Sequence, residues 1–221
     1  ALMRTAWRWH VWLGWLVAVP LLLWTLSGLV MVARPIEEVR GEHLRAPAGL
    51  LDPGALVVPD TGLSRELRLV AQPGGPVWIA VGPDGERRRF AGRTGRPMAP
   101  VSQAEARRIG AAAYLGTATL QGLTLYPPGS APSDLRGDQP AWQLRFSDRT
   151  HVYVHAQTGE VLALRTWWWR VFDLAWGLHI MDLETREDTS HPLLIGFAVL
   201  AVLGTLLGTI LLFRRRRRVR G

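Results

Sequence analysis

The chain contains no cysteine. This absence excludes thiolate-bound iron–sulfur clusters, cysteine-bound zinc and the covalent attachment of a c-type haem. It also excludes disulfides, so any domain outside the cytoplasm must be held together by its hydrophobic core alone. Glycine-rich phosphate loops, nucleophile elbows and the His-Glu-x-x-His pattern of zinc peptidases are absent as well. No catalytic constellation is therefore predicted, and the chain is expected to be a non-enzyme unless it binds a redox cofactor.

Charge is missing from two long apolar runs, Val11–Ala33 and Pro192–Phe213. Because a helix needs about 20 apolar residues to cross a bilayer core, each run is predicted to be a transmembrane helix. Arginines flank both runs on the side of the nearer chain end: Arg4 and Arg8 at one end, Arg214–Arg218 and Arg220 at the other. By the positive-inside rule, residues 1–10 and 214–221 are expected in the cytoplasm and residues 34–191 on the opposite side.

The formal net charge of +8 arises entirely from these flanks. They contain no acidic residue, whereas the 18 acidic residues of the insert are matched by as many basic ones. The excess charge is thus a topology signal and a contact for anionic membrane lipids, at about 1 kcal/mol per basic residue near the surface. A nucleic-acid partner is not expected.

Two further patterns belong to the predicted spans. Indole rings favour the membrane–water boundary, so the tryptophans at the entry to the first span are predicted to form an aromatic belt: Trp7, Trp9, Trp12 and Trp15. Three glycines of the second span share one helix face: Gly196, Gly204 and Gly208. Such a stripe allows close helix approach, so it is predicted to pack on the first span, on another membrane subunit or on a second copy of the chain.

The insert contains an internal repeat, because residues 76–98 align without a gap on residues 140–162. Identities fall at strand starts and turns, such as Trp78 on Trp142 and Thr94-Gly95 on Thr158-Gly159. Each copy predicts short antiparallel strands, and Ser102 with Glu105 forms a capping box that predicts a helix before the second copy. The fold class is therefore α+β, with modules at residues 34–100 and 101–165 between spans at 11–33 and 192–213.

Residues 166–191 connect the second module to the second span. Aromatic residues and a histidine recur there with helical spacing: Trp169, Phe172, Trp176 and His179. An amphipathic helix with an aromatic face is expected to lie in the outer membrane interface.

Three segments together resemble the PepSY-associated transmembrane family. They are Trp-Arg-Trp-His-Val-Trp-Leu-Gly at residues 7–14 with Thr25-Leu-Ser-Gly28, the module ending Val-Tyr-Val-His-Ala-Gln-Thr-Gly-Glu-Val-Leu at Val152–Leu162, and Gly177-Leu-His179. The resemblance implies a bacterial inner-membrane protein with a periplasmic domain of two PepSY-like modules, the first degenerate. Larger members resemble siderophore-iron reductases that carry b-type haem between four or more helices, whereas this chain has two spans.

Three histidines are candidate haem ligands: His10, His179 and His191. A helix as long as the first span rises about 35 Å, so His10 is not expected to share a haem with either of the others in one chain. A site combining His179 with His191, or one completed by another subunit, remains open. His151 and His155 lie about 13 Å apart on one strand, too far for one metal ion, and are expected to face solvent.

Three functions compete. The first is a non-catalytic accessory or binding subunit of a larger inner-membrane complex, presenting the periplasmic modules. The second is a haem-b electron-transfer component linked to iron or siderophore uptake. The third, implied by the resemblance alone, is regulation of a periplasmic peptidase.

Overall fold

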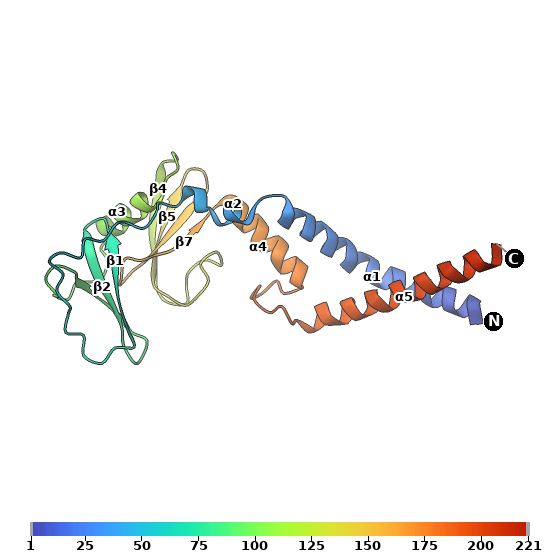
Figure 1. The fold of residues 1–221 in the computed structure, drawn as a ribbon. Coiled ribbons are helices and arrows are strands. Elements are labelled where there is room, and N and C mark those ends of the chain that lie inside the picture. The colour runs from blue at the N-terminus through green and yellow to red at the C-terminus, as the bar shows by residue number, and fades with distance from the viewer. Residues whose placement is uncertain (1, 220–221) are drawn as a thin grey trace. The chain divides into compact units, whose positions relative to one another are not determined.

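The structure is a computed structural model that describes residues 2–219 of the chain and the side chains of residues 4–213. It divides into two compact units (Figure 1). The helical unit combines both ends of the chain and contains α1 (Leu2–Val32), α4 (Trp167–Ile180) from Val171 onward, and α5 (Pro192–Val219). The central unit is Ile36–Arg170.

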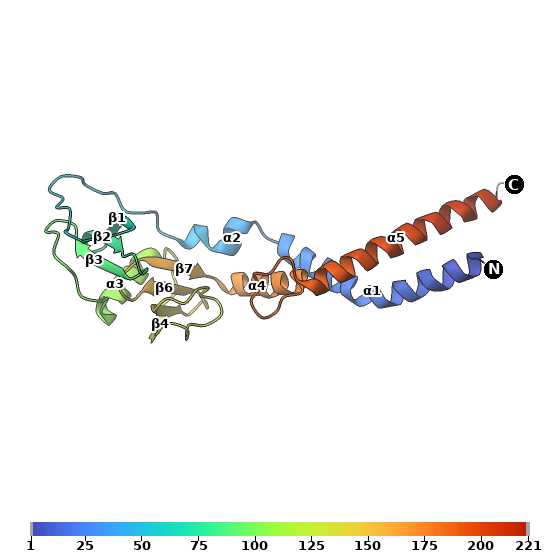
Figure 2. The same ribbon diagram turned by 90° about the horizontal axis from the view of Figure 1, so that it is seen from below.

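The two long helices of the helical unit run past each other in opposite directions, so that the two chain ends lie at the same end of the pair (Figures 1 and 2). Both are long and apolar enough to cross a membrane, over Arg4–Val32 and Pro192–Phe213. Helix α1 begins before the predicted span, because nothing in residues 2–10 breaks a helix, and it continues through Pro20.

Helices α1 and α5 approach each other where glycine leaves room for a side chain. A Cβ atom added at Gly208 would lie 2.7 Å from Cε1 of His10, and one added at Gly204 would lie 4.0 Å from Cβ of Leu13. The His10 ring also places Nδ1 3.2 Å from the Gly204 carbonyl oxygen. No atom lies within 4 Å of a Cβ built at Gly196, so that glycine takes no part in this contact.

The central unit contains two antiparallel sheets, ordered β1-β2-β3 and β4-β5-β6-β7, with α3 packed on the second. Its elements are α2 (Ile36–Arg40), the 3-10 helix η1 (Glu42–Leu44), β1 (Glu66–Gln72), β2 (Gly75–Val81), β3 (Arg87–Ala91), α3 (Gln103–Ala113), β4 (Leu120–Tyr126), β5 (Ala141–Phe146), β6 (His151–His155) and β7 (Val161–Arg165). This architecture confirms the predicted α+β class.

The internal repeat is present in the pairing of the strands. Trp78 faces Phe90 across β2 and β3, and Trp142 faces Val154 across β5 and β6. Every residue pair between β2 and β3 has a counterpart between β5 and β6, 64 positions later in the chain. The pair Val77–Ala91, for example, corresponds to Ala141–His155. A one-residue slip would have turned the buried side chains outward, so this shared register shows that both hairpins are the same structural unit.

Hydrogen bonds repeat with the register. Trp78 Nε1 donates to the carbonyl of Val57, and Trp142 Nε1 donates to the carbonyl of Val101, each at 2.9 Å. The glycine that follows each hairpin adopts a left-handed conformation, with φ 66° at Gly95 and 76° at Gly159. The modules differ beyond this unit, because only the second has a fourth strand and a covering helix.

Helix α3 begins as its capping residues predict and packs on the second sheet. The Ser102 hydroxyl accepts a hydrogen bond from the Glu105 backbone N–H. The buried face of the helix contains Ala106, Ile109 and Gly110. Gly110 meets Leu144 on β5, a fully buried residue, so closely that an added Cβ would lie 2.5 Å from a Leu144 methyl carbon.

Side chains of the first sheet fasten it to the second module. The Arg89 guanidinium makes two hydrogen bonds to the Glu105 carboxylate, at 2.7 and 2.8 Å. On another side, Gln72 Nε2 donates to the carbonyl of Thr158 at 2.8 Å. The two sheets therefore share α3 and the β6–β7 turn as common supports.

The close packing of α3 on the second sheet leads to a prediction about stability. Gly110→Val should destabilise the protein by about 1–3 kcal/mol, because a larger side chain there must displace packed core atoms. The matched control is Ala111→Val, at an exposed position of the same helix. Thermal unfolding of the full chain in detergent, followed by near-UV circular dichroism, measures both. Equal unfolding temperatures for the two variants would contradict the described packing.

Candidate functional site

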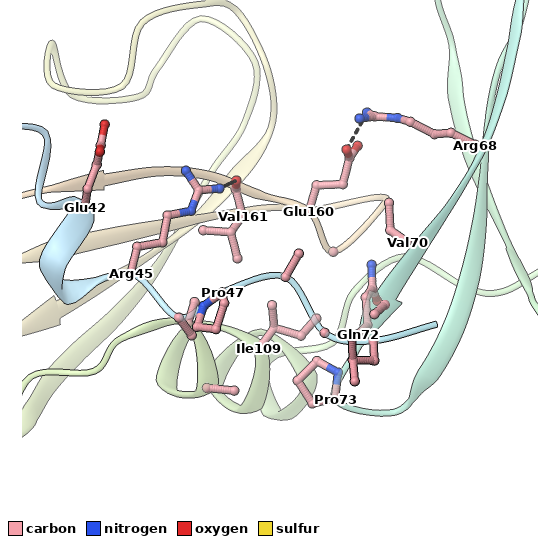
Figure 3. Close-up of a pocket in the computed structure, with 18 residues that line it drawn as sticks. Glu42, Arg45, Pro47, Arg68, Val70, Gln72, Pro73, Ile109, Glu160 and Val161 are labelled. Carbon is pink, nitrogen blue, oxygen red and sulfur yellow. Dashed lines mark hydrogen bonds and ion pairs between the residues drawn. The ribbon is translucent and has the colours of Figure 1, made fainter. Parts of the chain in front are cut away.

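A groove of about 940 Å³ lies between the two modules of the central unit (Figure 3). We call it the intermodule groove. Its walls are the segment 45–50, the outer edge of β1, the C-terminal half of α3 and the β6–β7 turn. Ile109 from α3 and Val161 from β7 give it an apolar lining, and Val70 and Gln72 line it from β1. Both modules are thus needed to build it.

The charges at the groove are partly paired. The Glu160 carboxylate is bound by Arg68 and Arg87, both from the first sheet, and it accepts a hydrogen bond from the Thr158 hydroxyl at 3.1 Å. Arg45 instead donates to a backbone carbonyl, that of Val161, at 3.3 Å. The groove therefore presents an exposed guanidinium as well as a carboxylate that is already neutralised.

A buried polar cluster connects the loop before β5 to the second sheet and to the first turn of α4. Asp134 lies at its centre, 5% exposed, and accepts hydrogen bonds from Tyr153 at 2.5 Å, His151 at 2.9 Å and Arg170 at 3.2 Å. Gln143 Nε2 completes the cluster by donating to the Tyr153 hydroxyl. Each group has a partner, as buried polar groups require, so the cluster holds the loop onto the sheet.

The cluster shifts the ionisation of its members. Burial on its own raises the pKa of the Asp134 carboxyl, but the hydrogen bonds from His151 and Tyr153 outweigh it and keep the pKa below its usual value. Burial, aided by the nearby Asp134 carboxylate, raises the pKa of the Tyr153 hydroxyl well above its usual range. Asp134 is thus a stable anion, and Tyr153 a permanent hydrogen-bond donor.

Tyr153 and its counterpart in the first module, Arg89, each bind a carboxylate from another segment of the chain. Tyr153 binds Asp134, and Arg89, which lies 64 positions earlier, binds Glu105. Each is a buried polar residue on the middle of a strand, and each secures a carboxylate from a different segment. The repeat therefore preserves an anchoring position while the residue and its partner change.

The solvent-facing prediction for His155 is wrong. The residue is 1% exposed, and its Nδ1 accepts hydrogen bonds from the backbone N–H groups of Gln157 and Thr158 at 3.1 and 3.2 Å. Burial, aided by the positive charge of Arg87, lowers the pKa of His155 to about 4. His155 is therefore uncharged at neutral pH, and it stabilises the β6–β7 turn by accepting hydrogen bonds from the backbone of that turn.

His179 lies against α1 in the helical unit. Its Nδ1 is 3.2 Å from the Trp24 carbonyl oxygen and 3.1 Å from the Ser27 hydroxyl, and its Cε1 is 3.4 Å from a Cβ built at Gly28. Since the carbonyl oxygen only accepts, this contact is a hydrogen bond in the tautomer that carries its proton on Nδ1. When a carbonyl holds Nδ1–H in this way, Nε2 is the ring nitrogen available to a metal.

A haem shared by His10 and His179 within one chain does not fit. His10 and the Ser27 that contacts His179 are 17 positions apart on α1, which corresponds to about 25 Å of helix rise. The cavity that α1 forms with α5 and Met181 has a volume of about 10 Å³, room for about one water molecule.

The remaining histidines show no ligand set. His191 precedes α5, and its Nδ1 is buried with no hydrogen-bond partner among the described residues. His43 is an exposed residue of η1. Within the described range, no three histidine, cysteine or carboxylate side chains gather as a metal site would require.

The aromatic residues divide into two groups. The predicted belt residues of α1 are all exposed, from 59% at Trp7 to 79% at Trp15. On α4, Trp169 is 9% exposed and lies under the Arg165 guanidinium, 4.3 Å from the ring centroid. Trp176 is half-buried and donates to the Arg186 carbonyl, and Phe172 is half-buried too. Packing within the protein thus explains the α4 face, and anchoring in the interface stays a prediction.

Sequence patterns did not predict the intermodule groove or the Asp134 cluster. The groove is formed in part by β1 and by segment 45–50. Segment 45–50 has no hydrophobic periodicity from which its position could be predicted. Asp134 lies in a proline-rich loop whose path is set by contacts distant in sequence. The signal that was present is the polar pair His151 and Tyr153 on one face of a strand whose neighbours are otherwise apolar.

The family model for the PepSY-associated TM region matches residues 7–220. The chain belongs to this family. Because the match includes both α1 and α5, which are long and apolar enough to span, the chain is a membrane protein whose two spans flank a PepSY-type α+β domain. No curated protein and no solved structure matches the chain.

The buried state of His155 makes a pH-dependent prediction. The unfolded chain takes up a proton at this histidine near pH 6.5, whereas the folded protein does so only near pH 4. Proton uptake therefore favours unfolding, and stability should fall as the pH is lowered from about 6.5 to about 4. His155→Gln should make this fall less steep, as measured by thermal unfolding of the full chain in detergent at several pH values.

The matched control is His43→Gln, because His43 is exposed. This variant should retain the pH dependence of the natural sequence. The comparison uses the slope of unfolding temperature against pH, so any uniform loss of stability in His155→Gln does not affect it. Identical slopes in all three proteins would contradict a neutral His155 in the folded state.

Proposed function

We propose that this protein is a non-catalytic accessory subunit that binds a partner in a larger membrane complex. The observation that carries the proposal is the intermodule groove, an open hollow of about 940 Å³ whose walls come from both modules. Hollows of about 300–1,000 Å³ with an apolar lining and a few polar groups are typical of small-molecule and cofactor sites, so this groove has the size and lining of a binding site. Two membrane spans then serve to hold this surface beside its partner.

The proposed location is the bacterial inner membrane, with both termini in the cytoplasm and the central unit in the periplasm. Arginine at both chain ends supports this orientation by the positive-inside rule. The two ends of the α1–α5 pair lie at the same end of the helical unit (Figure 2), as an even number of spans requires. The predicted tryptophan belt then lies at the cytoplasmic boundary.

The spans leave surface for lipid and for other helices. Their mutual contact uses Gly204 and Gly208, while Gly196 has no atom within 4 Å of its Cβ position. The outward faces of both helices are apolar and exposed, as at Leu22 and Leu193. We propose that lipid covers most of this surface and that a helix of another subunit, or of a second copy, packs at Gly196.

Photo-crosslinking in cells tests the binding role. A benzoylphenylalanine placed at Ala112, which lines the groove, should give an ultraviolet-dependent adduct of defined mass. The same group at Ala111, exposed on α3 but not among the residues that line the groove, should not. The crosslinked protein is then identified by mass spectrometry and co-expressed with the full chain to show co-purification. A peptidase found in this way would place peptidase regulation within the proposal.

A defined negative result would contradict the proposed role as a subunit. If neither position gives an adduct, and the chain extracted in mild detergent has the mass of a 24.6 kDa monomer, then it is not a subunit of a stable complex.

A second candidate is a haem-b electron-transfer component linked to iron or siderophore uptake, with the haem held between this chain and another subunit. The observation that favours it is the ring orientation of His10 and His179, because Nδ1 of each approaches a backbone carbonyl. Metal-ligating imidazoles are usually oriented in this way. His191, with its unpartnered Nδ1, is the third candidate ligand.

Absorption spectroscopy distinguishes this candidate from the first. The full chain, expressed with ample haem and purified in mild detergent, should show a Soret band if haem is bound. His179→Ala should abolish the band and His43→Ala should retain it, because His43 is an exposed residue of η1, outside both spans. Absence of a Soret band in the natural sequence would reject the haem role.

A further inference from the structure

In the described part of the chain, no strand pairs with the edge of β1 that borders the intermodule groove. The first sheet has the order β1-β2-β3, so β2 pairs with one edge of β1 only. Consecutive residues of β1 line the groove, Val70, Ala71 and Gln72. Because neighbouring strand residues point to opposite faces, lining by consecutive residues means that the backbone edge itself borders the groove.

A free strand edge offers a row of peptide N–H and C=O groups that bind another extended backbone. Among the described residues, no backbone hydrogen bond joins this edge of β1 to another segment. Segment 45–50 comes close, since a Cβ at Gly49 would lie 3.0 Å from the Ala71 Cβ, but that contact is between side-chain positions. The edge is therefore available for strand addition.

The floor of the groove suits apolar side chains. Ile109, Ala112 and Ala113 line it from α3, and Val161 lines it from β7 (Figure 3). In a strand added to β1, alternate side chains would point toward this floor and the others toward solvent. An occupant with alternating apolar residues is therefore favoured over a helix or a compact ligand.

The charged side chains that line the groove determine which polar side chains a bound peptide should carry. Two acids line the groove: Glu160 is bound by Arg68 and Arg87, and the exposed Glu42 lies 4.0 Å from Arg40, which lies outside the groove. Arg45 is exposed and has a backbone carbonyl as its partner, with no carboxylate within 4.0 Å in the part of the chain that the structure describes. The unpaired charge of the groove is thus positive.

From these features we infer that the groove binds an extended, acidic peptide segment of the partner protein, which adds as a strand to β1 and places a carboxylate on Arg45. This inference rests on the proposed binding role and names the chemistry of the partner. Strand addition supplies affinity through the backbone, and Arg45 with the apolar floor supplies selectivity.

Selection from a random library of displayed peptides tests the inference with the purified full chain in detergent. Enriched sequences should contain aspartate or glutamate among alternating apolar residues, and proline should be depleted because it removes a backbone donor. Binding of the enriched peptides should fall at least tenfold with Ala112→Trp, which fills the groove, and should be unchanged with Ala111→Trp.

A charge reversal sharpens the test. Arg45→Glu should abolish binding of the acidic peptides and, in a fresh selection, should enrich lysine or arginine in their place. Arg107→Glu, at an exposed position of α3 that does not line the groove, should leave the original selection unchanged. These pairs also control for misfolding, because each control changes the same residue type in the same unit.

Two results would overturn the inference: no enrichment at all, or enriched peptides that bind Ala112→Trp as well as the natural sequence. Enrichment of basic peptides by the natural sequence would overturn the role of Arg45. If crosslinking at Ala112 succeeds while selection fails, the protein still has its partner at the groove, but the partner is not an added acidic strand.

Discussion

The ion pair between Arg89 and Glu105 is the interaction on which the form of the central unit depends. Arg89 is on the first sheet, its side chain is 3% exposed, and it also donates to the Ala99 carbonyl at 2.8 Å. The hydrogen bonds from Arg89 keep the pKa of Glu105 below its usual value despite burial. Because removal of Glu105 would leave the buried Arg89 charge without its carboxylate, which is costly, the first sheet is held to α3. The groove between the modules follows from that attachment.

The contrast between the two modules shows how a repeated sequence supports different roles. Both hairpins keep the same strand register and the same tryptophan hydrogen bond. The second adds α3 and β7 and so buries an apolar core, which includes Leu144 and Val154. The first has neither, and it depends on the second through Arg89 and Gln72. The family match gives the chain its class, and these contacts show how the first module becomes a wall of the intermodule groove.

Much of the fold could be predicted from the sequence because its signals are local. Apolar length identifies the spans, the Ser102 cap identifies α3, and alternation identifies β5 and β6. Strands β1 and β4 were not predicted because they lie outside the two aligned segments of the repeat. The burial of His155 was missed because it depends on how a turn folds back on β6. Position along a strand gives the face of a side chain, but only tertiary packing decides whether that face meets water. The groove has the same origin, since its walls come from segments far apart in sequence.

The shared construction of the groove has a thermodynamic consequence. A ligand that touches β1, α3 and the β6–β7 turn at once binds the docked arrangement of the modules and not the separated one. By linkage, it strengthens their association by RT ln(1 + [L]/Kd), which adds to the Arg89–Glu105 contact. Ligand occupancy of the groove and the association of the two modules are then coupled in one equilibrium. A substitution that weakens the contact between the modules therefore also weakens ligand binding, even if it does not contact the ligand.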